Sequence, residues 1–176
     1  MIAAAPLEAR TAPLLALVDL RGIEGQRFGH SALNWGAEVL KIPADPGRLW
    51  FEQVKPRLLE TSPRVIGYST LGSLFCLERL GWDEGLRVNL RIEHRPLSDN
   101  KWSHAYHGRI PSWSRFLLQG AVTDFGILAA RVAFECRDGL ADCTHAAPLH
   151  HPEQRGDAMV TWVLAPSYRQ SSEDGA

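Results

Sequence analysis

The segment from Leu86 to Phe116 carries the residue types best suited to hold an anionic partner. Apolar and polar residues alternate from Leu86 to Arg95, and this pattern predicts a strand with one buried and one exposed face. The predicted exposed face is mostly arginine, whose planar guanidinium forms paired hydrogen bonds with phosphate and carboxylate groups. Aromatic, histidine and basic residues follow. The candidate ligand-binding residues are Arg87, Arg91, Arg95, Lys101, Trp102, Tyr106, Arg109, Trp113 and Arg115.

This segment is locally positive, although the whole chain has a formal net charge of −1. Electrostatic binding would therefore come from a local patch rather than from the protein as a whole. Aromatic rings can stack on bases while basic side chains neutralise phosphates, which favours single-stranded RNA or DNA as the partner. The structural alternative is that Trp102 and Trp113 pack over the sheet and the arginines form solvated ion pairs. A GC-rich genome would also produce the excess of arginine over lysine.

Two histidines of the same segment, His104 and His107, are candidates for acid–base chemistry. Imidazole titrates near neutral pH, so two neighbouring histidines could accept and donate the protons that move during phosphodiester cleavage. This possibility belongs to an enzymatic alternative, because nothing else in the segment completes a known catalytic motif.

A further catalytic candidate is Ser69, which forms the pattern G-x-S-x-x-G with Gly67 and Gly72. The surrounding residues predict a strand, a tight turn and a helix. The pattern is one residue longer than the nucleophile elbow G-x-S-x-G, and it has serine where the dinucleotide fingerprint has its second glycine. We therefore favour a turn in which serine or threonine caps the helix. The alternative is a small hydrolase or a nucleotide-dependent enzyme.

Residue types that bind metals gather towards the C-terminus. They are Cys136, Cys143, His145, His150 and His151. Zinc needs three or four such donors in a tetrahedral arrangement, and the C-x2-C pair that places two thiolates on one turn is missing. Cys136 is expected to end a core strand and the histidines to lie at the surface. We therefore expect no metal site and no cofactor, with a Cys/His metal-binding protein as the second alternative.

Short apolar or alternating runs predict strands at Leu14–Leu20, Arg64–Gly67, Leu86–Arg95 and Ala158–Ala165. Helical spacing of apolar residues predicts helices over His30–Lys41, Pro46–Leu58 and Thr70–Leu80. Asp45 should cap the second of these, Pro56 should interrupt it, and Gly81 should cap the third. The glycine-rich stretch Gly22–Gly29 and the stretch around Trp102 and Trp113 are expected to be loops, and Asp99–Asn100 a turn. The segment Val122–Cys136 fits both patterns, and its aromatic and β-branched residues favour a strand.

Predicted helices concentrate in the first half of the chain and predicted strands in the second half. This order predicts an α+β fold, with helices packed on an antiparallel sheet formed mainly by the second half. The 176 residues suit a single domain, expected over 1–168, followed by a flexible tail at 169–176. No apolar run reaches membrane-spanning length, and the N-terminus lacks the basic region of a signal peptide. Three cysteines at irregular spacing indicate reduced thiols, so a cytoplasmic protein is expected.

The function favoured by the sequence is a non-enzymatic binding module that holds an anionic partner on its arginine face. Single-stranded RNA or DNA is the first choice for this partner, and no membrane is expected to take part. Six tryptophans and an apolar N-terminal segment leave a protein partner or a homo-oligomer open.

Overall fold

The computed structural model describes residues 13–96, 102–111, 113–114, 124–136, 143–145 and 158–166. Its strands are β1 (Leu14–Val18), β2 (Glu38–Lys41), β3 (Arg64–Thr70), β4 (Leu86–Pro96), β5 (Trp102–Pro111), β6 (Cys143–His145) and β7 (Met159–Pro166). Its helices are α1 (Ile23–Asn34), α2 (Pro46–Leu49), the π-helical turn η1 (Trp50–Val54), α3 (Lys55–Thr61), α4 (Leu71–Asp83) and α5 (Phe125–Cys136).

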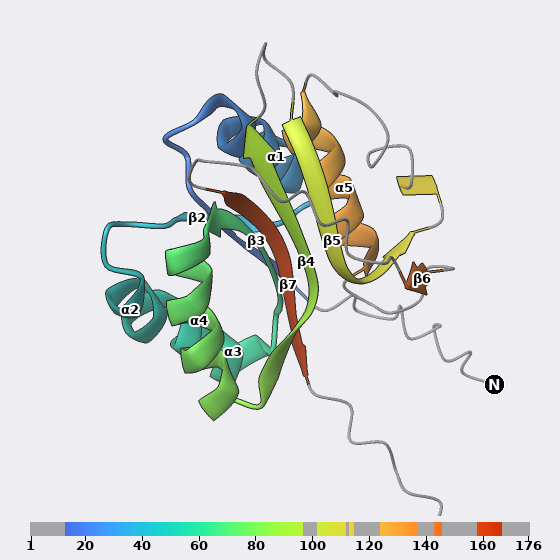
Figure 1. The fold of residues 1–176 in the computed structure, drawn as a ribbon. Coiled ribbons are helices and arrows are strands. Elements are labelled where there is room, and N and C mark those ends of the chain that lie inside the picture. Colours follow the sequence, from blue (N-terminus) through green and yellow to red (C-terminus); the bar gives the residue numbers. More distant parts are fainter. Residues whose placement is uncertain are drawn as a thin grey trace, which may run out of the picture.

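The strands form one mixed sheet in the order β2-β1-β3-β7-β4-β5-β6. The strands of the first half, β1, β2 and β3, pair in parallel, whereas the pairs made by β4, β5, β6 and β7 are antiparallel. Helices α1 and α5 cover one face, and α2, α3 and α4 lie on the other (Figure 1). The α+β class is confirmed, and the second half supplies the antiparallel part as predicted. The first half adds a parallel part that was not predicted.

Two apolar clusters hold the sheet between its helices. Successive residues of β1 enter different clusters: Ala16 and Val18 pack towards α1 and α5, and Leu15 and Leu17 towards α2 and α4. A strand buried on both faces must be apolar at every position, which explains the continuous run at the start of the described chain. No described helix has the length and apolar character needed to cross a membrane.

Strand β4 does not have the single buried face that its alternating sequence predicts. Leu86 and Val88 pack with α4, whereas Leu90 and Ile92 pack with α5. The pairing register with β7 shifts between Val88 and Leu90. A bulge of this kind inserts one residue and moves the following side chains to the opposite face. The apolar residues of β4 therefore serve both cores, a division that the period-2 pattern conceals.

Helix α1 corrects two predictions, because it occupies the expected loop Gly22–Gly29 and ends before Lys41. Its glycines allow close packing: a Cβ on Gly25 would lie 1.9 Å from the carbonyl oxygen of Asp19. The helix ends at Asn34, and Gly36 with a φ of 79° turns the chain into β2.

Within the segment predicted as a strand at Val122–Cys136, Phe125–Cys136 forms the helix α5 instead. Its small residues Ala129 and Ala133 are buried against the α1 side of the core. Gly126 allows close approach as well, because a Cβ there would lie 2.2 Å from the carbonyl oxygen of Glu24. The buried Glu24 carboxylate also accepts a hydrogen bond of 2.6 Å from the Gly126 backbone N–H at the start of α5. Packing against α1 therefore overrides the local β propensity.

Some of the local predictions are confirmed and others are wrong. Asp45 accepts hydrogen bonds from two backbone N–H groups at the start of α2, and Pro56 is the second residue of α3, directly after η1 interrupts the predicted helix. The predicted cap at Gly81 is wrong, because α4 continues to Asp83 and Gly85, with a φ of 74°, turns the chain after it. The segment after Trp102 is a strand rather than a loop. The predicted turn Asp99–Asn100 and the tail lie outside the described residues.

Candidate functional site

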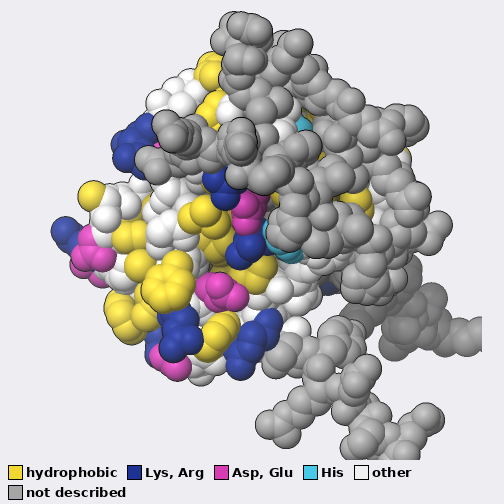
Figure 2. All heavy atoms as spheres, in the orientation of Figure 1, with side chains coloured by type: hydrophobic (Ala, Val, Ile, Leu, Met, Phe, Trp, Pro, Cys, Tyr) yellow, Lys and Arg dark blue, Asp and Glu magenta, His cyan; other side chains and the backbone are white. Residues whose placement is uncertain are grey.

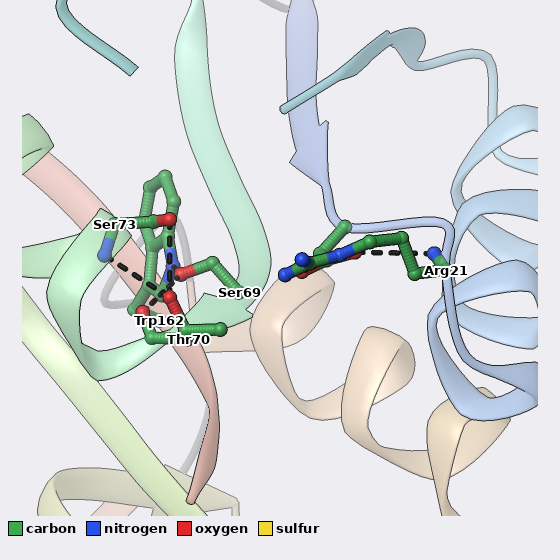
Figure 3. Close-up of polar contacts among 6 residues, drawn as sticks. Arg21, Ser69, Thr70, Ser73 and Trp162 are labelled. Carbon is green, nitrogen blue, oxygen red and sulfur yellow. Dashed lines mark hydrogen bonds and ion pairs between the residues drawn. The ribbon is translucent and has the colours of Figure 1, made fainter. Parts of the chain in front are cut away.

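Ser69 lies at the end of β3, next to the start of α4 (Figure 3). Its buried hydroxyl accepts a hydrogen bond from Trp162 Nε1 at 3.0 Å and donates one to the Thr70 carbonyl oxygen at 3.0 Å. Thr70 is the residue that caps α4, because its hydroxyl accepts from the Ser73 backbone N–H at 3.2 Å. Within the described part of the chain, no histidine is hydrogen-bonded to Ser69. The geometry is that of a structural turn and not of an activated nucleophile.

The two glycines of the G-x-S-x-x-G pattern have different explanations. A Cβ on Gly67 would lie 2.1 Å from a ring carbon of Trp162, so the indole of β7 can cross this position because no side chain is there. A Cβ on Gly72 would meet nothing within 4 Å. Gly67 is therefore a packing requirement, and Gly72 is not required by its surroundings.

Asp19 follows the neighbouring parallel strand β1, and the pairing of Val18 with Tyr68 places it at the same C-terminal end of the strands as Ser69. Ligands of open α/β sheets often bind at the C-terminal ends of the strands. The preferred place is between two neighbouring strands whose following connections run to opposite sides of the sheet. Here Arg21 Nε donates to the buried Asp19 carboxylate at 2.9 Å, and this hydrogen bond lowers the pKa of Asp19. The Asp19 carboxylate and the Arg21 guanidinium are therefore hydrogen-bonded to each other.

His94 and His104 form a buried pair on the face of β4 and β5 that packs against α5. Their Nδ1 atoms are 2.7 Å apart, and His94 Nε2 lies 2.9 Å from Thr161 Oγ1. Burial lowers the pKa of His104 to about 4, and burial together with His104 lowers the pKa of His94 well below its usual value. Both rings are therefore neutral at pH 7. His104 Nε2 is buried and has no hydrogen-bond partner among the described residues.

Sequence reasoning found His104 but missed His94. The signal was present, because His94 continues the spacing of Leu90 and Ile92, which are both buried in the same cluster. A polar residue at a core position of a strand indicates a buried hydrogen-bonded group.

The two histidines proposed as an acid–base pair lie on opposite faces of β5. His104 pairs across the strands with His94 on the α5 face, whereas His107 pairs with Arg91 on the other face. His107 Nε2 lies 3.7 Å from Glu93 Oε1, and its side chain is 39% exposed. The two imidazoles therefore cannot act together on one substrate atom.

Arg91 and Arg95 occupy the face of β4 that is turned away from α5. Glu93 lies between them: its Oε1 is 2.8 Å from Arg91 Nη2, and its Oε2 is 3.1 Å from Arg95 Nη2. Side chains of both charges gather near the middle of the view in Figure 2. Arg91 Nε is buried and has no hydrogen-bond partner among the described residues. We call Arg91, Glu93, Arg95 and His107 the charged face of β4.

The aromatic candidates are separated from the charged face. Tyr106 is buried on the α5 side, and the Trp102 ring centroid lies 4.8 Å from that of Phe125. Trp113 donates a hydrogen bond of 2.5 Å to Glu135 of α5, and Arg131 lies over its ring. The structure thus places these three rings against α5 and does not bring them to Arg91 and Arg95.

The remaining candidates are partly or wholly outside the described residues. Arg87 is described and reaches the end of α4, where its Nη1 donates to the Trp82 carbonyl oxygen at 3.4 Å. Lys101, Arg115, His150 and His151, and the side chains of Arg109, Cys143 and His145, are not described. Cys136 is buried in the core on α5 rather than at the end of a strand. Among the described residues, no group of three or more His, Cys, Asp or Glu side chains could hold a metal ion.

Of the three places built from candidate residues, the Ser69 turn and the histidine pair lie inside the fold, and the charged face of β4 reaches solvent. No protein-family model, no curated protein and no solved structure matches this chain. The geometry of these sites is therefore the evidence on function.

Proposed function

We propose that this chain is a binding module that holds a phosphate-bearing anionic partner on the charged face of β4. Single-stranded nucleic acid is the favoured partner. The observation that carries the proposal is the buried Arg91 Nε, a charged donor with no acceptor among the described residues. Buried polar groups are nearly always hydrogen-bonded, so such a donor marks a position where an anionic oxygen would be stabilised.

The charged face keeps binding capacity although its charges are paired. Each guanidinium has five N–H donors, and Glu93 takes one Nη2 group from each arginine. The two arginines and one carboxylate leave a local charge of about +1 when His107 is neutral. Glu93 also fixes the orientation of both guanidinium groups, which reduces the entropy that they would lose on binding a phosphate.

The proposal is tested by fluorescence anisotropy with a labelled single strand of about 12 nucleotides, a length within the site sizes of known single-strand binders. If Arg91 and Arg95 each neutralise one phosphate, affinity should fall about 7-fold between about 50 and 200 mM salt. Arg91→Ala and Arg95→Ala should each weaken binding to all sequences alike and make the salt dependence shallower. Arg131→Ala is the matched control, because it removes an exposed arginine of α5 from the opposite face.

No binding at low salt would overturn the proposal. Equal losses for Arg91→Ala and Arg131→Ala would also overturn it, because they would indicate nonspecific attraction to total charge. Equal affinity for the single strand and for inorganic polyphosphate would retain the anion site and remove nucleic acid as its favoured partner.

The hydrolase alternative has less support from the geometry. The Ser69 hydroxyl is hydrogen-bonded to Trp162 and to the Thr70 carbonyl oxygen at the start of α4. His104 and His107 lie on opposite faces of β5. No specific observation favours a metal-dependent function over the binding function.

A further inference from the structure

We infer that Trp82, with Arg79 and Arg87 beside it, forms a base-stacking subsite that extends the charged face of β4 for a single strand of nucleic acid. The inference rests on the proposed function and adds what that function lacks, an accessible aromatic ring on the same side of the sheet as Arg91 and Arg95.

The ring of Trp82 lies at the surface beside two guanidinium groups. Trp82 is 39% exposed near the end of α4. Arg79 Cζ lies 4.2 Å from the ring centroid, and Arg87 Cζ lies 5.2 Å from it. Such an arrangement holds positive charge next to an aromatic face. Base–aromatic stacking and phosphate neutralisation are the two interactions that single-strand binders combine.

The charges of this subsite are less compensated than those of the charged face of β4. Neither Arg79 nor Arg87 forms an ion pair with a described residue, whereas Arg91 and Arg95 share Glu93. Arg87 Nη1 donates to the carbonyl oxygens of Trp82 at 3.4 Å and Leu86 at 2.7 Å. Neutral carbonyl groups hold this guanidinium in place without cancelling its charge. A phosphate is therefore attracted here without first displacing a carboxylate.

Trp82 and Arg79 belong to α4, the helix that covers the same side of the sheet as the charged face of β4. Arg87 lies between Leu86 and Val88, which both pack in the α4 cluster, so its side chain leaves β4 on the other face. Its Cζ nevertheless lies 5.2 Å from the centroid of the Trp82 ring, at the start of the strand. Arg91 pairs in register with Trp162, a residue of that same cluster. From Arg87 to Arg95 the strand extends about 26 Å at 3.3 Å per residue. Figure 2 shows hydrophobic and positive side chains close together on the described surface, with acidic side chains among them.

The sequence pattern does not single out Trp82 for stacking. It favours Trp102 and Trp113, because their segment is expected to be a loop, but both pack towards α5. A base approaching Trp82 would take the place of one guanidinium on the ring, and that guanidinium could then contact the adjoining phosphate. Because every base has a π-face, this contact tolerates any sequence.

The test compares two labelled ligands of about 12 units: oligothymidylate, and a strand with the same phosphates and abasic sugars. The wild-type protein should bind oligothymidylate about 5- to 150-fold more tightly than the abasic strand, which is the effect of stacking one base. Trp82→Ala should remove this preference and leave affinity for the abasic strand unchanged. Trp82→Phe should retain part of the preference. Phe75→Ala is the matched control, because Phe75 is another exposed aromatic residue of α4, and it should retain the full preference.

The outcomes separate this inference from the proposed function. If the wild-type protein binds neither ligand, both fail. If it binds both ligands equally and Arg91→Ala weakens both, the charged face stands and the base-stacking subsite is refuted. A preference that survives Trp82→Ala refutes the subsite as well. Tryptophan fluorescence gives a second readout, which needs only the conservative variant Trp82→Phe. Oligothymidylate should quench the fluorescence of the wild-type protein more than that of Trp82→Phe. Equal quenching refutes the role of Trp82.

Discussion

Acidification is expected to destabilise this protein through the buried pair of His94 and His104. Burial lowers the pKa of His104 from 6.5 to about 4 in the folded protein. Between these values the unfolded chain binds more protons than the folded chain, so lowering the pH favours unfolding. The stability is fully present above pH 6.5 and is lost as the pH falls towards about 4.

The size of the effect follows from the two pKa values of His104. At about pH 5 the unfolded imidazole is almost fully protonated and the folded one almost fully neutral, which costs about 2 kcal/mol of unfolding free energy. His94 acts in the same direction, because its pKa is also lowered by burial and by the neighbouring ring. This loss is a large fraction of the stability of an ordinary domain, which is about 5–15 kcal/mol.

The measurement is urea unfolding of the wild-type protein at a series of pH values from about 7.5 to 5. His104→Gln isolates the contribution of this imidazole, because the carboxylates of both proteins titrate alike. The variant should be less stable than wild type near pH 7, and its loss of stability on acidification should be smaller by about 2 kcal/mol. His107→Gln is the control, because His107 is 39% exposed and lies on the other face of β5. An equal pH dependence of wild type and His104→Gln would show that His104 does not cause the loss of stability.

Three other predictions follow from contacts described above. Gly67→Ala should destabilise the protein by about 3 kcal/mol in urea unfolding, because its Cβ would overlap the Trp162 ring. Gly72→Ala should instead stabilise it by about 0.5–1 kcal/mol, because a Cβ there would meet nothing within 4 Å. If Gly67→Ala does not lower the stability, the contact between Gly67 of β3 and Trp162 of β7 is contradicted. Ser69→Ala should cost about 1–3 kcal/mol of stability because the buried Trp162 N–H loses its acceptor, and wild-type Ser69 should not react with a fluorophosphonate probe; labelling at Ser69 would show that the hydroxyl is accessible. Glu93→Gln should tighten binding of a single strand and make its salt dependence steeper, because both flanking guanidinium groups lose their counter-charge; weaker binding would show that Glu93 acts mainly to position them.

Elements with local signals could be predicted from the sequence alone. A continuous apolar run gave the position of β1, and the fold explains it because that strand is buried on both faces. Asp45 followed by proline marked the start of α2, since capping needs only the backbone N–H groups of the next turn. The arginines of β4 were also identified correctly as a surface feature, because Arg91 and Arg95 reach solvent.

Features that depend on a partner distant in the sequence are set by tertiary packing and could not be predicted. The segment of α5 is helical because its small residues fit against α1, with Glu24 capping its start from 102 positions away. Ser69 is a structural residue because its hydroxyl accepts a hydrogen bond from Trp162, which lies 93 positions away in the sequence. The bulge in β4 divides one alternating pattern between two cores. Which tryptophan stays accessible beside the arginines depends on which face each helix covers, and periodicity along one strand carries no information about that covering.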